Sequence, residues 1–383
     1  MKCKVIVVIL LVSMFLFLLF WKVEPVKDLS KPDFFVGVDA VSNNVEDIKR
    51  LVDEVKSYTN LFVICSTGIT YNVTKLDEVC QYIYERGLYF MIFFHKNENI
   101  PQSRWIEEAR QRWGKQFVGL YAYDEAGGHQ IDASEFMLVK EADNYTDASN
   151  KFVGKLEDAL NDIKDYPIYA GDFPLFTSDY CLYWFDYQAG YDVVLCEFGW
   201  NHSRLLNIAL NRGAAKMQNK DWGVMITWTY QHSPYIESAD ELYHDMVLAY
   251  LSGAKYVIVF SHPMENSWNQ TITEEHLDAM KNFWHYTQTN PQTPLIDGPT
   301  SIQTAYVLPK DYGWGFRGYE DKVWGLWVDE LSIKIGTDVN YLLCTRHIGL
   351  DIIYDDPKYY NAMHAYSKLY FWNGTVLTNN NKQ

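Results

Sequence analysis

Eight short apolar segments alternate with amphipathic segments from residue 34 onward, and this alternation limits the possible folds more than any other feature. Within the amphipathic segments apolar residues recur every three or four positions, as in Ile48, Leu51, Val52 and Val55, which is typical of a helix packed on a sheet. Alternating strands and helices imply right-handed parallel crossovers, and eight strands within roughly 260 residues predict a (β/α)8, or TIM, barrel. The predicted strands are residues 34–38, 61–65, 88–94, 117–123, 166–171, 191–196, 222–229 and 256–260.

An open, doubly wound α/β sheet is the competing fold, because it also alternates strands with helices. Its first strand normally leads into a Gly-x-Gly-x-x-Gly turn. This chain has Gly37-Val38-Asp39-Ala40-Val41 at that place, which lacks the turn. The barrel is therefore the predicted fold, over residues 33–295.

The N-terminus has the layout of a signal peptide or signal-anchor over residues 1–23, because Lys2 and Lys4 precede a long apolar run. No small-x-small cleavage site follows, which favours an uncleaved membrane anchor, a linker at 24–32 and the remaining chain outside the cell. If the segment is cleaved, the protein is secreted. Five Asn-x-Ser/Thr sequons agree with an extracellular glycoprotein, and they begin at Asn72, Asn144, Asn201, Asn269 and Asn373.

A Pro-rich break at Pro291, Pro294 and Pro299 separates the barrel from a second region at 300–383. This region is predicted to be a small α/β accessory domain with a frayed tail from Thr378. Its predicted elements are strands at 304–308, 322–328 and 350–354, a helix at 332–346, and a final element that ends at Trp372.

The charge balance disfavours nucleic acid and anionic membrane surfaces as partners, since the net charge is −16 and no basic patch is present. Membrane contact is expected only through the N-terminal apolar segment. The six cysteines show no Cys-x-x-Cys or Cys/His spacing, so neither a structural zinc site nor a cofactor is predicted. The aromatic content of 16% fits either a densely packed interior or a surface that stacks on sugar rings.

Acidic and aromatic residues follow several predicted strands. The active site of a TIM barrel is built from loops at the carboxyl ends of its strands, so these residues are candidates for one shared rim. Several acids at one rim raise one another's pKa, which allows a carboxyl group to act as a general acid near neutral pH. The residues are Asp39, Ser66, His95, Asp124, Glu125, Asp172, Glu197, Tyr230, His262 and Glu265.

Strand parity separates the two acids after the fourth strand. Gly119, Tyr121, Tyr123 and Glu125 share the side expected to face the barrel axis, so Glu125 is the first catalytic candidate. Asp124 is its predicted orienting neighbour. The pair Gly127-Gly128 is expected to let the following loop turn away at positive φ.

Glu197 is the second catalytic candidate, because it follows an uninterrupted apolar run on the sixth strand. Two carboxylates across an aromatic pocket suit glycosidic bond cleavage, and the separation of their carboxyl groups distinguishes retention from inversion. Trp228 is also compatible with simple core packing. The candidate substrate-binding residues are Asp39, His95, Asp172, Trp200, Trp228, Tyr230 and His262.

Through Tyr123-Asp124-Glu125 and Leu195-Cys196-Glu197, residues 34–291 resemble the (β/α)8 glycoside hydrolases. In the largest group of these enzymes the proton donor is a Glu after strand four, commonly preceded by Asn, and the nucleophile is a Glu after strand seven. This chain has Asp124 in place of that Asn. Its strand seven ends in 227–230, Thr-Trp-Thr-Tyr, without an acid.

A pairing of strand four with strand six instead resembles the retaining α-galactosidase type, in which both acids are Asp. The accessory domain is similar, in its order of elements, to the small α/β domain that follows the barrel in some β-galactosidases. The resemblance therefore implies an O-glycosyl hydrolase that acts on an oligo- or polysaccharide.

Two other functions are compatible with parts of the sequence. A metal-dependent hydrolase would use loop histidines, but the His-x-His expected on the first strand is absent, as is a Gly-x-Ser-x-Gly elbow for a serine hydrolase. A non-catalytic surface protein would use the aromatic rim to bind polysaccharide or a neighbouring protein. The loop histidines are His95, His129, His202, His232 and His262.

Overall fold

The structure is a computed structural model that describes residues 32–94, 102–164, 173–261, 271–292 and 304–379. Residues 33–383 form one compact unit. Within the described ranges no helix is long and apolar enough to cross a membrane. The predicted anchor at 1–23 lies outside the described residues, so the structure does not test it.

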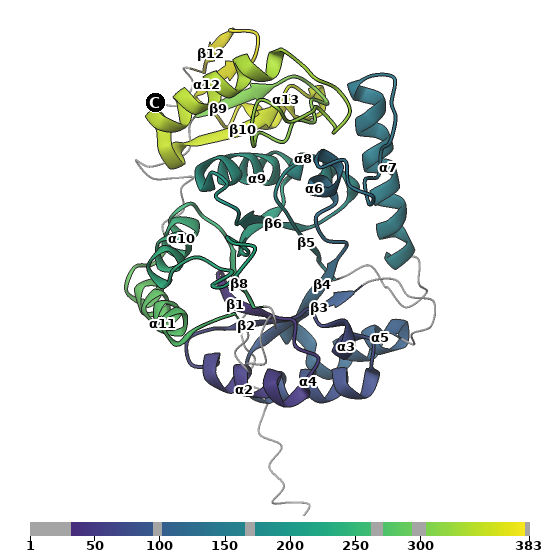
Figure 1. Ribbon diagram of the computed structural model, residues 1–383, viewed down its shortest axis with the longest axis vertical. Coiled ribbons are helices and arrows are strands. Elements are labelled where there is room, and N and C mark those ends of the chain that lie inside the picture. Colours follow the sequence, from purple (N-terminus) through teal and green to yellow (C-terminus); the bar gives the residue numbers. More distant parts are fainter. Residues whose placement is uncertain (1–31, 95–101, 165–172, 262–270, 293–303, 380–383) are drawn as a thin grey trace, which may run out of the picture. The chain divides into compact units, whose positions relative to one another are not determined.

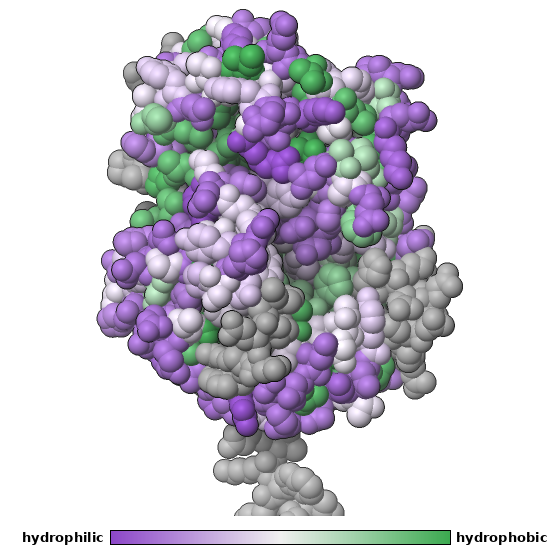
Figure 2. Space-filling model, in the orientation of Figure 1, coloured by the Kyte–Doolittle hydropathy of each residue, from purple (hydrophilic) through white to green (hydrophobic). Residues whose placement is uncertain are grey.

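Eight parallel strands close into a barrel in chain order, as the alternation predicted, and Figure 1 looks along this ring. The strands are β1 Phe35–Ala40, β2 Leu61–Ile64, β3 Tyr89–Phe94, β4 Phe117–Ala122, β5 Leu175–Asp179, β6 Val193–Phe198, β7 Asp221–Ile226 and β8 Tyr256–Ser261. On the face shown in Figure 2, hydrophilic residues predominate and hydrophobic ones form scattered groups.

Helices surround the ring because each turns an apolar stripe toward it. In α2, for example, Ile48, Leu51, Val52 and Val55 are buried, as their spacing predicted. The helices are α2 Val45–Val55, α3 Thr67–Thr70, α4 Val73–Glu85, α5 Gln102–Trp113, α6 Ala126–Ile131, α7 Tyr145–Lys164, α8 Tyr183–Ala189, α9 Arg204–Gln218, α10 Ala239–Leu251 and α11 Glu274–Thr289.

Large aromatic rings fill one end of the barrel interior. Phe35 stacks on Tyr256 with ring centroids 5.0 Å apart, and Phe176 meets the same ring edge-on at 5.1 Å. A Cβ at Gly119 would lie 2.7 Å from Phe176, so β4 needs glycine to admit this ring. The inward side of β4 is therefore the one that parity predicted.

The predicted fifth strand is misplaced. Residues 165–172 are outside the described ranges, and the strand that pairs with β4 and β6 is Leu175–Asp179. The polar run Thr177-Ser178-Asp179 resembles a turn in composition, but all three side chains are buried at the carboxyl end of β5. The strand boundaries also place Asp39 and Glu197 inside β1 and β6 rather than after them.

A four-stranded sheet follows the barrel in the order β10-β9-β11-β12. We call residues 304–379 the appendage. The predicted strand at 322–328 is wrong, since only an isolated bridge joins Val323 to Trp327. The elements are β9 Thr304–Leu308, α12 Leu331–Arg346, β10 Leu350–Tyr354, α13 Tyr360–Met363, β11 Lys368–Phe371 and β12 Val376–Thr378.

The appendage docks on α9 of the barrel. A Cβ at Gly213 of α9 would collide with the carbonyl oxygen of Ile352 in β10, so the two elements approach as closely as glycine permits. Next to this contact, Arg212 Nε donates to Asp351 Oδ1 at 2.7 Å, and Arg212 Nη2 donates to Leu350 O at 2.9 Å. Both charged side chains are buried.

We predict that Arg212→Met lowers the free energy of unfolding by about 3–5 kcal/mol, because it leaves the Asp351 carboxylate buried without its main ionic partner. Urea denaturation measures the loss. Arg86→Met is the matched control, since it breaks the partly exposed pair with Asp53 and should cost less than about 1 kcal/mol. Equal losses in the two variants would contradict a docking role for Arg212.

Candidate active site

Acidic side chains from four barrel strands meet at one rim. Burial and the charges of Asp124 and Asp179 raise the pKa of Glu125, and burial and the charges of Glu125 and Asp124 raise that of Glu197. Asp39 interacts with Asp124 as well. The rim therefore brings together Asp39 and all three predicted catalytic acids.

The turn after β4 has an unusual backbone. Tyr123 and Glu125 have φ of 50° and 52°, the left-handed region that residues other than glycine rarely adopt. The Glu125 N–H donates to Ser178 O at 3.0 Å, which ties this turn to the end of β5. Asp124 lies between the two left-handed residues.

Asp179 caps the helix that follows. Its carboxylate accepts from the backbone N–H groups of Gly127 at 2.6 Å and Gly128 at 2.9 Å, which open α6, and from Tyr180 N at 2.7 Å. Glu125 occupies the N-cap position of α6 but makes no side-chain capping bond. Because Asp179 takes that role, the Glu125 carboxyl is free to turn toward the rim.

The role predicted for the glycine pair is wrong. Gly127 and Gly128 lie inside α6 and do not have positive φ. A Cβ at Gly128 would overlap the Tyr180 ring, and one at Gly127 would lie 2.6 Å from Cys181 O. The glycines are needed because β5 and its following loop pack directly on the first turn of α6.

The carboxyl groups of Glu125 and Glu197 interact electrostatically across the rim. Two interacting carboxyls resist being ionised together, which favours a proton on one of them. Glu197 is only 4% exposed, and its Oε1 accepts from Ser178 Oγ at 2.6 Å. Asn207 Nδ2 also donates to the Glu197 carbonyl oxygen at 2.9 Å, which fixes this end of β6.

The hydroxyl groups of Tyr121 and Ser178 hydrogen bond to the carboxylates of Asp124 and Glu197. Tyr121 Oη bonds Asp124 Oδ1, while Ser178 Oγ lies 2.9 Å from both Asp124 Oδ1 and Tyr121 Oη. A serine hydroxyl has one proton to donate, and the contact of Ser178 with Glu197 is its shorter one. Ser178 therefore donates to Glu197, and Tyr121 donates to Asp124. Because donation from Ser178 favours the ionised form of Glu197, a proton held by the glutamate pair is favoured on Glu125.

Burial governs the electrostatics of the rim. Burial, together with the negative charges of Asp124 and Asp179, raises the pKa of Glu125 to about 8. Burial also raises the pKa of Glu197, together with the charge of Glu125. Burial of its carboxyl group also raises the pKa of Asp124, and hydrogen bonds from Tyr121 and Ser178 oppose the rise.

Asp39, which was predicted to bind substrate, is buried in the barrel wall. It is 1% exposed, and it interacts electrostatically with the Cys65 thiol. Burial raises its pKa from 3.8 to about 8. Asp39 is therefore a neutral acid beneath the rim at neutral pH.

The structure separates the predicted aromatic residues. Trp200 and Tyr230 are exposed, at 40% and 44%, but line different cavities. Trp228 is half-buried and packs against Tyr235 and Phe260, with ring centroids 5.7 Å away in each case. Trp228 therefore packs among aromatic rings, and its role in substrate binding stays a prediction.

Three predicted binding residues, His95, Asp172 and His262, lie outside the described residues. The prediction that Asp172 follows the fifth strand is wrong, because β5 ends at Asp179. Sequence reasoning missed Ser178 and Asp179 through that error. Among the described residues no group of three or more His, Cys, Asp or Glu side chains has the arrangement of a metal site.

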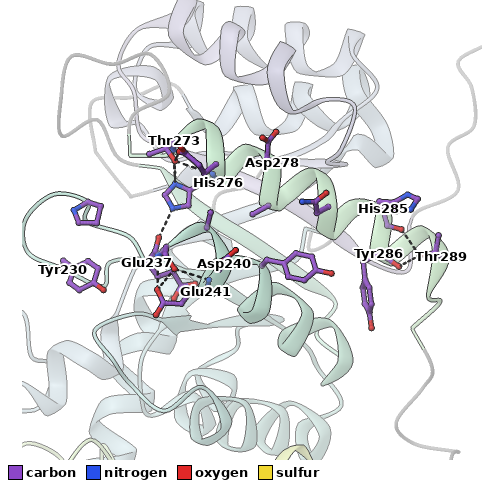
Figure 3. Close-up of a pocket in the computed structure, with 17 residues that line it drawn as sticks. Tyr230, Glu237, Asp240, Glu241, Thr273, His276, Asp278, His285, Tyr286 and Thr289 are labelled. Atoms are coloured by element: carbon purple, nitrogen blue, oxygen red, sulfur yellow. Dashed lines mark hydrogen bonds between the residues drawn. The ribbon is translucent and has the colours of Figure 1, made fainter.

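The most voluminous of the described cavities, about 990 Å³, is not at this rim. It runs along α10 and α11, with Tyr230 near one end and Tyr286 and Thr289 at the other (Figure 3). Within it, Glu237 pairs with Arg204 at 2.8 Å, and the Glu237 carbonyl meets His276 Nε2 at 2.8 Å. The acidic side chains converge at the barrel mouth, so the candidate active site is placed there and not in this cavity.

No protein-family model and no curated protein matches the sequence. Among solved structures, a β-galactosidase from the psychrophilic Marinomonas ef1 matches with a TM-score of 0.50 and 12% identity, over 88% of this chain and 72% of that one. A β-mannanase from the blue mussel Mytilus edulis matches with a TM-score of 0.43 and 9% identity, over 67% and 93%. A 3-dehydroquinate dehydratase from Geobacillus kaustophilus HTA426 matches with a TM-score of 0.36 and 9% identity, over 67% and 92%.

The likeness to the β-galactosidase concerns the fold alone, and with the closed barrel it confirms the predicted (β/α)8 fold. A barrel of this kind supports many chemistries, so an activity must be argued from the site.

We predict that the free energy of unfolding falls as pH rises from about 4 to about 8. In this range the folded state keeps a proton on Asp39 that the unfolded state releases, so each pH unit costs up to about 1.4 kcal/mol. Asp39→Asn stays neutral, and its stability should decline less over the same range. The exposed Glu46→Gln is the control and should follow the parent; an equal slope in Asp39→Asn and the parent would refute this placement of the proton.

Proposed function

We propose that the protein is a glycoside hydrolase that uses Glu125 and Glu197 and retains the anomeric configuration. The observation that carries the proposal is the mutual interaction of these two carboxyl groups, which meet at the ends of β4 and β6. Inverting enzymes keep their carboxyls about 6.5–9.5 Å apart to admit a water molecule, whereas retaining ones hold them at about 5–5.5 Å. The mutual interaction of the Glu125 and Glu197 carboxyls supports the shorter separation and therefore retention.

Glu125 is the proposed general acid and base. Its raised pKa keeps a proton available near neutral pH, and Asp179 relieves it of capping α6. It would protonate the glycosidic oxygen as the bond to the anomeric carbon breaks. In the second step it would take a proton from the attacking water.

Glu197 is the proposed nucleophile. Ser178 donates to its Oε1 at 2.6 Å, which favours the ionised form once the Glu125 proton passes to the substrate. Its carboxylate oxygen would form a bond to the anomeric carbon, and water would then displace the sugar and restore the carboxylate. The negative charge of Asp124 raises the pKa of both glutamates, and Asp124 is the proposed orienting neighbour.

The proposed substrate is an oligo- or polysaccharide without strong negative charge. The net charge of −16 opposes nucleic acids and polyanionic glycans, and the reaction uses only side chains of this chain. Trp200, which follows Glu197 by three residues and is exposed, supports sugar binding close to the acids.

We predict that Glu125→Gln and Glu197→Gln each lower kcat about 10²- to 10⁴-fold on any glycoside that the parent cleaves, because each removes a group that acts on the reacting bond. The assay uses residues 33–383 and a panel of α- and β-linked oligosaccharides. Glu157→Gln, on the exposed side of α7, is the matched control.

Two results would contradict the proposal in different ways. Glycan binding without cleavage by the parent would favour a non-catalytic carbohydrate-binding protein. Cleavage by both variants at the parent's rate would show that other residues carry the reaction.

The proposed location is the cell surface, with residues 1–23 as an anchor and the barrel outside, or the medium if this segment is removed. The layout of Lys2, Lys4 and the apolar run supports it. We predict that the full chain sediments with membranes and resists alkaline extraction, whereas residues 33–383 alone remain soluble. Recovery of both forms in the cytosol would contradict this location.

A further inference from the structure

A cavity of about 520 Å³ lies between the barrel and the appendage. The loop after β6 supplies Trp200 and His202, and the appendage supplies Trp314, Arg317 and Tyr319 from the segment between β9 and α12. The cavity is therefore built from two regions that are far apart in the sequence. It is separate from the groove shown in Figure 3.

Aromatic rings in this cavity remain open to solvent. Trp200 is 40% exposed and Tyr319 is 52% exposed. Within the described ranges Trp200 is the most exposed tryptophan. Leaving such rings in water forgoes about 25 cal/mol for each Å² of apolar surface, and a flat sugar face that stacks on them would recover it.

The barrel side of the cavity is held rigidly. The Trp200 N–H donates to Trp228 O at 2.7 Å. Arg204 Nη1 donates to Gly199 O at 3.2 Å and to His202 O at 3.1 Å. Arg204 is itself fixed by Asp245 at 2.7 Å and by a second carboxylate from the same side of the barrel. A ring held in this way binds with little loss of conformational freedom.

The appendage side is equally fixed. The rings of Trp314 and Phe316 pack with centroids 4.4 Å apart. Arg317 pairs with Asp321 at 2.9 Å and with Asp132, the C-cap of α6. Two carboxylates thus offset the one guanidinium, so the cavity favours an uncharged ligand over an anionic one.

The cavity adjoins the proposed catalytic acids. Trp200 follows Glu197 by three residues, a distance of at most about 11 Å along the chain. Asn207 lines the cavity and also donates to the Glu197 carbonyl oxygen at 2.9 Å. The ring of Tyr180, the residue after Asp179, lies 5.9 Å from the His202 ring.

We propose that this cavity is a distal subsite that binds an uncharged sugar unit of the glycan cleaved at Glu125 and Glu197. The claim that the bound sugar belongs to a substrate rests on the proposed function. The claim that the cavity binds a sugar does not. It gives the appendage a direct part in recognition, because Tyr319 would stack on a sugar that the barrel alone cannot enclose. The substrate would then be a chain of several sugars.

The test compares KM for an oligosaccharide and for a short aryl glycoside in the parent, Tyr319→Ala and Tyr319→Phe. Loss of one stacked ring should raise KM for the oligosaccharide about 3- to 10-fold in Tyr319→Ala, with kcat and the short substrate unaffected. Tyr319→Phe keeps the ring and should behave like the parent. Tyr341→Ala is the matched control, since Tyr341 is 69% exposed on α12 and does not line the cavity.

Calorimetric titration of the oligosaccharide into Glu197→Gln, with and without Tyr319→Ala, separates this proposal from the proposed function. If the parent cleaves glycans but Tyr319→Ala leaves KM and the titrated affinity unchanged, the subsite is refuted and the function stands. If the parent cleaves nothing, the function fails and the titration alone decides: a 3- to 10-fold weaker affinity in Tyr319→Ala supports a glycan site, and an equal affinity overturns it.

Discussion

The cap that Asp179 places on α6 is the interaction on which the rest of the site depends. One carboxylate at the end of β5 accepts from four backbone N–H groups, those of Gly127, Gly128, Tyr180 and Cys181. The first turn of a helix must have such acceptors, and an acid at the N-cap usually supplies its own. Because β5 supplies it here, Glu125 keeps its side chain for the rim.

This arrangement has a structural requirement and an electrostatic consequence. The close approach of β5 excludes a Cβ at both helix glycines and holds Glu125 in the left-handed region. It also adds the Asp179 charge to the burial and the Asp124 charge that raise the pKa of Glu125. The position of Asp179 therefore contributes both to the shape of the turn and to the raised pKa of the proposed acid.

Sequence patterns foresaw the barrel because each strand and helix repeats a period that a buried sheet and its covering helices require. Parity on β4 also placed Tyr121 on the inward side, and its hydroxyl group does reach Ser178. The fifth strand could not be found in this way, since Thr177, Ser178 and Asp179 are polar residues in a strand. They are buried because they bond other rim groups, a relation that appears only when β4, β5 and β6 are side by side.

The same limit applies to the glycine pair and to the appendage. Glycine allows both positive φ and close packing, and only the Tyr180 ring shows which one is used at Gly128. The apolar residues at 322–328 suggested a strand, yet Trp324 is fully buried in a loop, where it packs on Phe152 and Phe185. The catalytic roles of Glu125, Glu197 and Asp124 stay predictions.

The central claim is that Glu197 forms a covalent bond to the sugar, and trapping measures this most directly. The parent would be incubated with a panel of 2-deoxy-2-fluoro glycosyl fluorides, digested, and its peptides sequenced by mass spectrometry. We expect a glycosyl adduct on Glu197 and none in Glu197→Gln. An adduct on Asp124, or a product of inverted configuration without any adduct, would contradict the proposed mechanism.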